Sequence, residues 1–532
     1  MLAALATTAA TAQTGYDIHR HDAPSSSYES SATVGNDIEN ARLYILRSHP
    51  SIVGTLADSA SAPNALLRFG FANQIASGDY MHSEGNHTTD LNVLAGGEMN
   101  IKGIGTLYGR ALYSRFKKRG MYQNYAIRPD DYAPYLVSDT TSIGAAENER
   151  YLVEGGLSMS SGRWHYGVSG FYEGISSAKE TLPRRSAYNY WFRIGLSVAR
   201  VEPGWMVSLK AWPEINKQSV SASSTQTPVR FLQSYGFGQW NRKESTSGYG
   251  YGRDAQILGA GGEALFRINS KSESGWDALL TVGYNYRWMQ TEESNFKNLY
   301  SSKTHRLWHN LAVSKGFRSA SLHLLLAGEA YIRSGAENVY ENRNVDQEQS
   351  LYDYVLVGTN DFYHRTTFNE SLRIKGLWRI SPIHKVGLTA GARLEGYNEK
   401  YDSPQMVVKN YTVAPQAGIN YVMDNKRSCL DINITATLQT PMSNTYDLGG
   451  TTATPVTEMA QAYIPYLLRG ESRWQLNASA AYWHSLGRGR IGAELSATHG
   501  KRTDAPYIDH LNSPFGTARS TTGIGINVFY MF

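Results

Sequence analysis

The sequence predicts an all-β fold: a transmembrane, antiparallel, up-and-down β-barrel of about 18 strands, with a range of roughly 16–20. Three observations predict it. Segments that alternate apolar and polar residues follow one another from residue 64 to the end. Short and long connections alternate between these segments. The chain ends on an apolar, aromatic-ended strand.

The last strand has a continuous apolar stripe on one face. Side chains of a strand point to opposite faces with a period of two. The residues of the stripe therefore lie on one face, as expected of a barrel-closing strand that contacts lipid. They are Ile524, Ile526, Val528, Tyr530 and Phe532. This tail resembles the C-terminal signal of bacterial outer-membrane barrels, and we expect the barrel-assembly machinery to recognise it.

Composition agrees with a membrane barrel. The 532 residues include 36 Tyr, 50 Gly and 11 Trp, and the mean hydropathy is −0.41. Tyr and Trp favour membrane–water interfaces. No run of about 18 apolar residues predicts a helical span. The net charge of +5 comes from dispersed Lys and Arg, which argues against nucleic acid as a partner.

Composition and residue pattern divide the chain into three regions. Residues 1–12 have the pattern of a signal-peptide remnant, with Ala10, Thr11 and Ala12 before the expected cut. Residues 13–63 predict a periplasmic N-terminal extension or a small plug. Within them, Asp37 to Arg47 predicts a short helix with Asn36 as its cap. Residues 64–532 predict the transmembrane barrel.

Long polar stretches separate the predicted hairpins. They cover 119–149, 176–185, 219–253, 335–360, 441–471 and 502–518, with shorter ones near 77–87, 294–302 and 401–410. The turns inside the hairpins are short. This alternation is typical of short periplasmic turns and long extracellular loops. An even strand count then places the N-terminus in the periplasm.

The alternation also predicts which face meets lipid. In 275–293, Val282, Tyr284 and Trp288 share one face, and Asn285 and Arg287 share the other. A soluble β-sandwich would bury its apolar faces against each other. A lipid-embedded barrel turns them outward and keeps polar side chains in the lumen.

Several segments are similar to an uncharacterised family of outer-membrane β-barrels from Bacteroidota. They are 42–54 before the first strand, 67–72 at its start, 108–113, and 129–135. The resemblance implies gene neighbourhoods with TonB-dependent receptors and surface lipoproteins, and hence an accessory role in uptake. It carries over no catalytic or binding residue.

The strand faces that are predicted to point into the lumen carry charged residues, which are candidates for lining a channel. These lumen-lining candidates are Arg287, Arg333, Arg373, Lys375, Arg393, Glu395, Glu329 and Asp431. Rings of like charge can set ion selectivity, whereas opposite charges can pair across strands and stiffen the wall. Arg373, Lys375 and Arg393 share one hairpin with Glu395, and we expect an anion path there if the lumen is open.

The predicted loop 219–253 contains aromatic residues that are candidates for recognition of a ligand or protein, and they lie among Gly, Ser and Arg. They are Tyr235, Phe237, Trp240, Tyr249 and Tyr251. Aromatic side chains bury much area at low entropic cost, which suits recognition of a ligand or protein. A loop packed on itself over the barrel mouth explains them equally well.

The sequence does not predict an enzyme, a cofactor or a metal site. His305 and His309 lie four residues apart on a predicted strand, about 13 Å from each other. Two functions remain open. The first is a porin-like channel or an accessory component of a TonB-linked nutrient uptake system. The second is an occluded barrel that acts as a scaffolding subunit of an outer-membrane complex.

The predicted location is the bacterial outer membrane, with an integral barrel and a periplasmic N-terminus. The expected partners are outer-membrane lipid and lipopolysaccharide, the barrel-assembly machinery, and a TonB-dependent receptor or surface lipoprotein.

Overall fold

The computed structural model describes most of the chain. The described residues are 36–57, 65–122, 124–139, 143–179, 181–237, 241–269, 275–293, 296–346, 351–425, 427–447, 466, 468–487, 489–504, 507–508, 513–514 and 519–531. The predicted signal-peptide remnant, Trp240 and Phe532 lie outside them.

One 18-stranded antiparallel sheet closes on itself, which confirms the predicted fold class. Its strands are β1 (Ala65–Ser77), β2 (His87–Ile101), β3 (Gly105–Met121), β5 (Gly144–Ser161), β6 (Trp164–Lys179), β7 (Arg184–Glu202), β8 (Trp205–Ser223), β11 (Gly250–Asn269), β12 (Trp276–Glu293), β13 (Phe296–Gly316), β14 (Ala320–Asp346), β15 (Leu351–Arg379), β16 (His384–Asp402), β17 (Gln405–Asp424), β18 (Ser428–Asp447), β19 (Ser472–Leu486), β20 (Gly489–Asp504) and β23 (Ser520–Met531).

The last strand closes the barrel. β23 pairs with β20 on one side and with β1 on the other, so Tyr530 lies opposite both Ile491 and Leu67. Ile524, Ile526 and Val528 are 43–49% exposed, whereas the Phe529 side chain of the opposite parity is buried. The predicted apolar stripe therefore faces outward along the described part of this strand.

Exposure along the wall is inverted relative to a water-soluble protein. Val282 is 52% exposed and Tyr284 is 43% exposed, but Asn285 and Arg287 are buried. Apolar side chains outside and polar side chains inside are what a bilayer requires. Exposed tryptophans mark one rim, next to the short turns, as an aromatic girdle would; they are Trp164, Trp205, Trp276 and Trp378.

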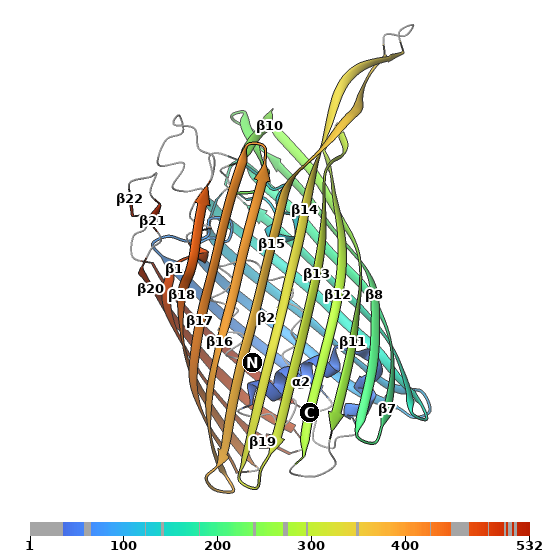
Figure 1. The fold of residues 1–532 in the computed structure, drawn as a ribbon, viewed down its shortest axis with the longest axis vertical. Coiled ribbons are helices and arrows are strands. Elements are labelled where there is room, and N and C mark those ends of the chain that lie inside the picture. The colour runs from blue at the N-terminus through green and yellow to red at the C-terminus, as the bar shows by residue number, and fades with distance from the viewer. Residues whose placement is uncertain are drawn as a thin grey trace.

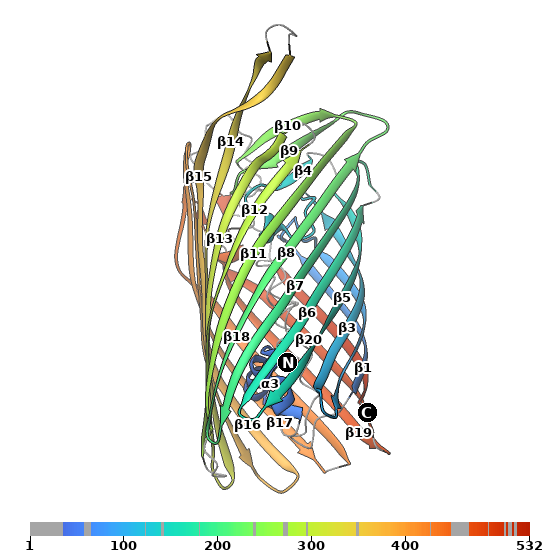
Figure 2. The ribbon, with the colours of Figure 1, turned by 90° about the vertical axis from the view of Figure 1, so that its right-hand side faces the viewer.

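Short turns gather at one end of the barrel and longer connections at the other (Figure 1). Several predicted loops were wrong, because strands extend into them; 294–302, for example, is β13 from Phe296 onward. Most of 335–360 is strand, since β14 and β15 continue as a paired hairpin that projects beyond the rim (Figure 2). The region 401–410 is a tight hairpin between β16 and β17. The predicted strands stop where the sequence becomes polar, but backbone pairing continues after a strand leaves the lipid.

The remaining described elements lie off the barrel wall. They are α2 (Asp37–Arg47), α3 (Pro50–Ala57), α4 (Pro129–Tyr132), the three-stranded sheet of β4 (Val137–Asp139), β9 (Val229–Ser234) and β10 (Arg242–Gly248), and the pair β21 (Tyr507–Ile508) and β22 (Ser513–Pro514). Among the described helices, none has the length and apolar character to cross a membrane.

Candidate functional site

Helices α2 and α3 lie inside the barrel near the short-turn end (Figures 1 and 2). The predicted helix and its cap are confirmed, because the Asn36 side chain accepts a hydrogen bond from the Glu39 N–H at 3.2 Å. We call α2 and α3 together the lumen helices. One side of them is apolar and packs on the wall, where Ile38, Ile45, Leu46 and Ile52 join a cluster that contains Met206, Leu265, Leu279 and Leu325.

A carboxylate at the start of α2 meets two cations of β15. Asp37 accepts hydrogen bonds from Arg373 at 2.8 Å and from Lys375 at 2.9 Å. Burial by itself would raise the pKa of Asp37, but Lys375 and Arg373 outweigh it and hold that pKa below its ordinary value. Two of the three basic residues predicted to line an anion path, Arg373 and Lys375, are therefore paired with a carboxylate of the chain itself.

A second charged group fixes the middle of α2. Arg42 forms ion pairs with Glu39 one turn earlier and with Asp277 of β12. Arg267 of β11 also binds Asp277, at 2.7 Å. At the start of the helix, the Asn36 amide contacts the His323 ring at 3.0 Å. Polar contacts thus reach three different parts of the wall.

The turn between the helices is held by a buried histidine. His49 lies 2.8 Å from Glu263 through Nε2 and 2.9 Å from Ser208 through Nδ1. The first turn of α3 donates its Ser51 N–H to Ser197 at 2.7 Å, so a helix end that would otherwise lack a partner is capped by the wall. Gly167 permits this approach, because a Cβ there would lie 2.2 Å from the Ser51 nitrogen.

The Asp37 contact predicts a test of how firmly α2 is docked. Asp37→Asn should weaken docking by about 2–5 kcal/mol, because Lys375 and Arg373 lose their carboxylate in a buried interface. Hydrogen exchange of the amides of 37–47 measures the loss. Glu39→Gln is the matched control, since Arg42 keeps Asp277 in that variant. Equal protection in wild type and Asp37→Asn would contradict the role of this contact.

His49 predicts a pH dependence. Burial lowers the pKa of His49 below its ordinary 6.5, although the hydrogen bond to Glu263 and the Glu263 charge oppose this. Docked helices then bind a proton less readily than undocked ones. Docking is fully stabilised above about pH 6.5 and weakens as the pH falls below it. Amide exchange of 50–57, corrected for intrinsic rates, should rise between about pH 7.5 and 5.5 in wild type but not in His49→Gln.

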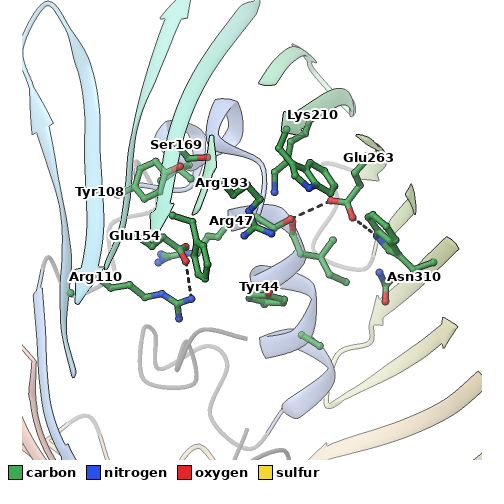
Figure 3. Close-up of a pocket in the computed structure, with 18 of the residues that line it drawn as sticks. Tyr44, Arg47, Tyr108, Arg110, Glu154, Ser169, Arg193, Lys210, Glu263 and Asn310 are labelled. Atoms are coloured by element: carbon green, nitrogen blue, oxygen red, sulfur yellow. Dashed lines mark hydrogen bonds and ion pairs between the residues drawn. The ribbon is translucent and has the colours of Figure 1, made fainter. Parts of the chain in front are cut away.

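A chamber of about 560 Å³ lies beside α2 in the lumen. Figure 3 shows Tyr44 and Arg47 of α2 between two parts of the wall, with the Arg110–Glu154 pair on one side and Glu263 on the other. Phe171, Trp212 and Trp308 also line the chamber. Charged, aromatic and aliphatic side chains all bound it; Ile45, Leu94 and Leu325 are among the aliphatic ones.

At the opposite end, residues 124–139 fold into the lumen; we call them the inner loop. Arg128 of this loop is fully buried and forms an ion pair with Glu173 of β6. Arg150 also binds Glu173, at 2.7 Å. The loop therefore crosses to the wall through a charge pair that is shielded from water.

A second group of charges holds the short helix α4. Asp131 is buried and lies 3.1 Å from Arg287, one of the predicted lumen residues. Arg287 in turn binds Glu214 at 2.7 Å. Arg333, another predicted residue, donates to the Ala133 carbonyl at 2.9 Å. Both predicted arginines face the lumen, and both contact the inner loop.

The aromatic candidates divide by exposure. Tyr235 and Phe237 are buried in a cluster with Tyr135 of the inner loop and Tyr363 and Tyr397 of the wall. Their placement is that of a loop packed on itself and on the barrel. Tyr251 is buried in a neighbouring cluster, and Tyr249 is 57% exposed.

The other predicted lumen residues contact neighbours on the wall. Arg393 pairs with Glu395 at 2.9 Å, Glu329 with Arg306 at 2.9 Å, and Asp431 accepts from Asn420 at 2.7 Å. Arg393 thus lies against Glu395 of its own strand β16, whereas Arg373 and Lys375 of β15 bind Asp37. Within the described ranges, no group of three or more His, Cys, Asp or Glu side chains could hold a metal ion.

The residues of the lumen helices and the inner loop that bind these wall residues were not predicted from the sequence. Asp37 and Arg42 lie in the predicted helix 37–47, His49 follows it, and Arg128 lies in the predicted loop 119–149. An acidic first turn followed by a basic residue at 42 was the available signal. It could not indicate which wall residues these charges meet.

Comparisons with known proteins give a family without an assigned role. The model described as "Family of unknown function (DUF6850)" matches residues 61–530. No curated protein matches the chain.

Among solved structures, the chain is similar to several receptors and transporters. The FrpB iron transporter of Neisseria meningitidis has 9% identity and a TM-score of 0.40, over 88% of this chain and 81% of that chain. The ferric enterobactin receptor PfeA of Pseudomonas aeruginosa has 11% identity and a TM-score of 0.35, over 88% and 82%. The ferric yersiniabactin uptake receptor FyuA of Yersinia pestis has 10% and 0.35, over 89% and 81%. No functional inference follows from likeness at this level.

Proposed function

The chain belongs to the family of unknown function DUF6850, and we propose that it is an outer-membrane transport barrel that is closed by two gates of its own chain. The lumen helices, 36–57, are the lower gate. The inner loop together with 229–237 is the upper gate. The chamber beside α2 lies on the path between them.

The observation that carries this proposal is the polar docking of the lumen helices. Ion pairs at Asp37 and Arg42 and the hydrogen-bonded His49 hold α2 and the start of α3 against the wall. Contacts of this kind are sensitive to protonation and to competing charges, so a segment held by them can be released. An open porin-like channel is the weaker reading, because the helices and the upper gate both occupy the lumen.

The experiment that tests the proposal is single-channel recording in a planar bilayer. The full-length protein should remain closed for most of the record, and a barrel from which both gates have been removed should conduct. A barrel of this strand number is wide enough to hold an aqueous channel once nothing fills it. The short-turn end would face the periplasm, as in other outer-membrane barrels.

A scaffolding role is the second candidate, and the projecting β14–β15 hairpin favours it. Beyond the rim this hairpin exposes Tyr352, Tyr354 and Leu356 at 44–62%. Exposed apolar groups outside the lipid band often mark protein contacts. A folded barrel that stays silent after both gates are removed would support this role over transport.

A further inference from the structure

The chamber has the size and shape of a small-molecule site. Its volume of about 560 Å³ falls within the range of roughly 300–1,000 Å³ that is usual for ligand pockets. Tyr44 and Ile45 of α2 and its C-cap residue Ser48 form one side, and the barrel wall forms most of the rest.

The lining carries more positive than negative groups. Six basic side chains line it: Arg47, Arg110, Arg193, Lys210, Arg306 and Arg373. Four carboxylates do so: Glu98, Glu154, Glu263 and Glu329. Each of the four contacts a cation or a histidine of the chain, at 2.8–3.6 Å. Counting Asp37, which binds Arg373, five carboxylates face the six cations, and the remaining positive charge favours an anion in the chamber.

Aromatic rings lie beside the cations. The Arg193 guanidinium is 4.9 Å from the centre of the Phe171 ring and 5.9 Å from that of Trp212. The Lys210 ammonium is 5.0 Å from the centre of the same Trp212 ring. Two cations from neighbouring strands β7 and β8 thus meet at one indole, and Figure 3 shows both pointing into the chamber.

Trp308 extends this surface. Its ring centre is 6.0 Å from that of Trp212, and its N–H donates to Glu263 at 2.5 Å. Paired indoles offer flat apolar area for a ring, and the adjacent guanidinium and ammonium suit a carboxylate. A ligand with both parts would satisfy both features of the wall.

We propose that the chamber binds a small organic anion with a ring-shaped body. Its carboxylate lies between Arg193 and Lys210, and its ring lies against Trp212 and Trp308. This inference rests on the proposed transport function, for which it names the class of cargo.

Equilibrium dialysis of the full-length protein in detergent tests the inference, with incubation long enough for slow gates to open. The probes are glucuronate and benzoate, each compared with a neutral analogue, glucose or benzyl alcohol. At least one anion should bind, and its neutral analogue should bind at least about tenfold more weakly. Sugar-acid and aromatic-acid binding are distinguished by which probe is retained.

Substitutions place the binding in the chamber. Arg193→Gln and Lys210→Gln should each weaken binding by about tenfold or more. Arg343→Gln on the projecting hairpin is the matched control and should bind like wild type. Two separate variants are used because, if one of them fails to fold, the other still shows whether the anion binds in the chamber.

Three outcomes would overturn the inference: neither anion binds, a neutral analogue binds as well as its anion, or the folded chamber variants bind like wild type. Bilayer recordings of barrels without gates separate this failure from failure of the transport function. Conduction without anion binding rejects the cargo class alone, and binding without conduction rejects transport alone.

Discussion

A barrel that lacks both gates should conduct ions steadily, whereas a barrel that lacks only one should stay closed. The two gates lie in series along one lumen, so the more tightly closed gate sets the current. The lower gate is removed by deleting 36–57. The upper gate is removed by replacing 124–139 and 225–247 with short Gly-Ser linkers, because the strand ends on either side of each are close: Met121 pairs with Gly144, and Ser223 with Gly250.

Four proteins in planar bilayers complete the test: full length, each single-gate variant and the double variant. Circular dichroism establishes that each is a folded β-sheet protein. The expected pattern is strongly non-additive, with steady openings in the double variant alone. Steady current from the full-length protein would contradict the gates. Steady current from one single variant would show that only that segment closes the lumen.

Arg128→Gln should release the inner loop from the wall. The Arg128 and Glu173 side chains are both fully buried, and Arg128 also lies 3.8 Å from Asp131. Removing one partner of a buried ion pair costs about 3–5 kcal/mol, because the other charge stays buried. Arg150 still binds Glu173, so we expect about 3 kcal/mol, the lower end of that range. The loss should appear as faster amide exchange in 124–139.

The barrel itself should be unaffected, because its strand pairing does not involve Arg128. Amide exchange in β6 and β7 therefore serves as an internal reference. Arg230→Gln is the matched control, since Arg230 pairs with Glu244 on the exposed surface of the β9–β10 hairpin. That change should alter exchange of the inner loop by less than about 0.5 kcal/mol. Unchanged exchange in Arg128→Gln would mean that aromatic packing, rather than this pair, holds the loop.

The alternation of residues determined the wall of this protein. A period of two fixes which side chain faces lipid, so Val282 and Ile526 could be placed outside and Arg287 inside from the sequence alone. The final strand and the even strand number follow from the same pattern. Strand ends were less predictable, because backbone pairing in β14 and β15 continues where side chains become polar.

The contents of the lumen depended on tertiary structure. Whether Arg373 lines an open path or pairs with Asp37 depends on two segments 336 residues apart. Tyr235 and Phe237 show the same limit, since a recognition loop and a folded-in loop have the same composition. Alternation records only the direction of each side chain from its own strand. Which distant group occupies the space it points into is decided by closure of the barrel and by packing inside it.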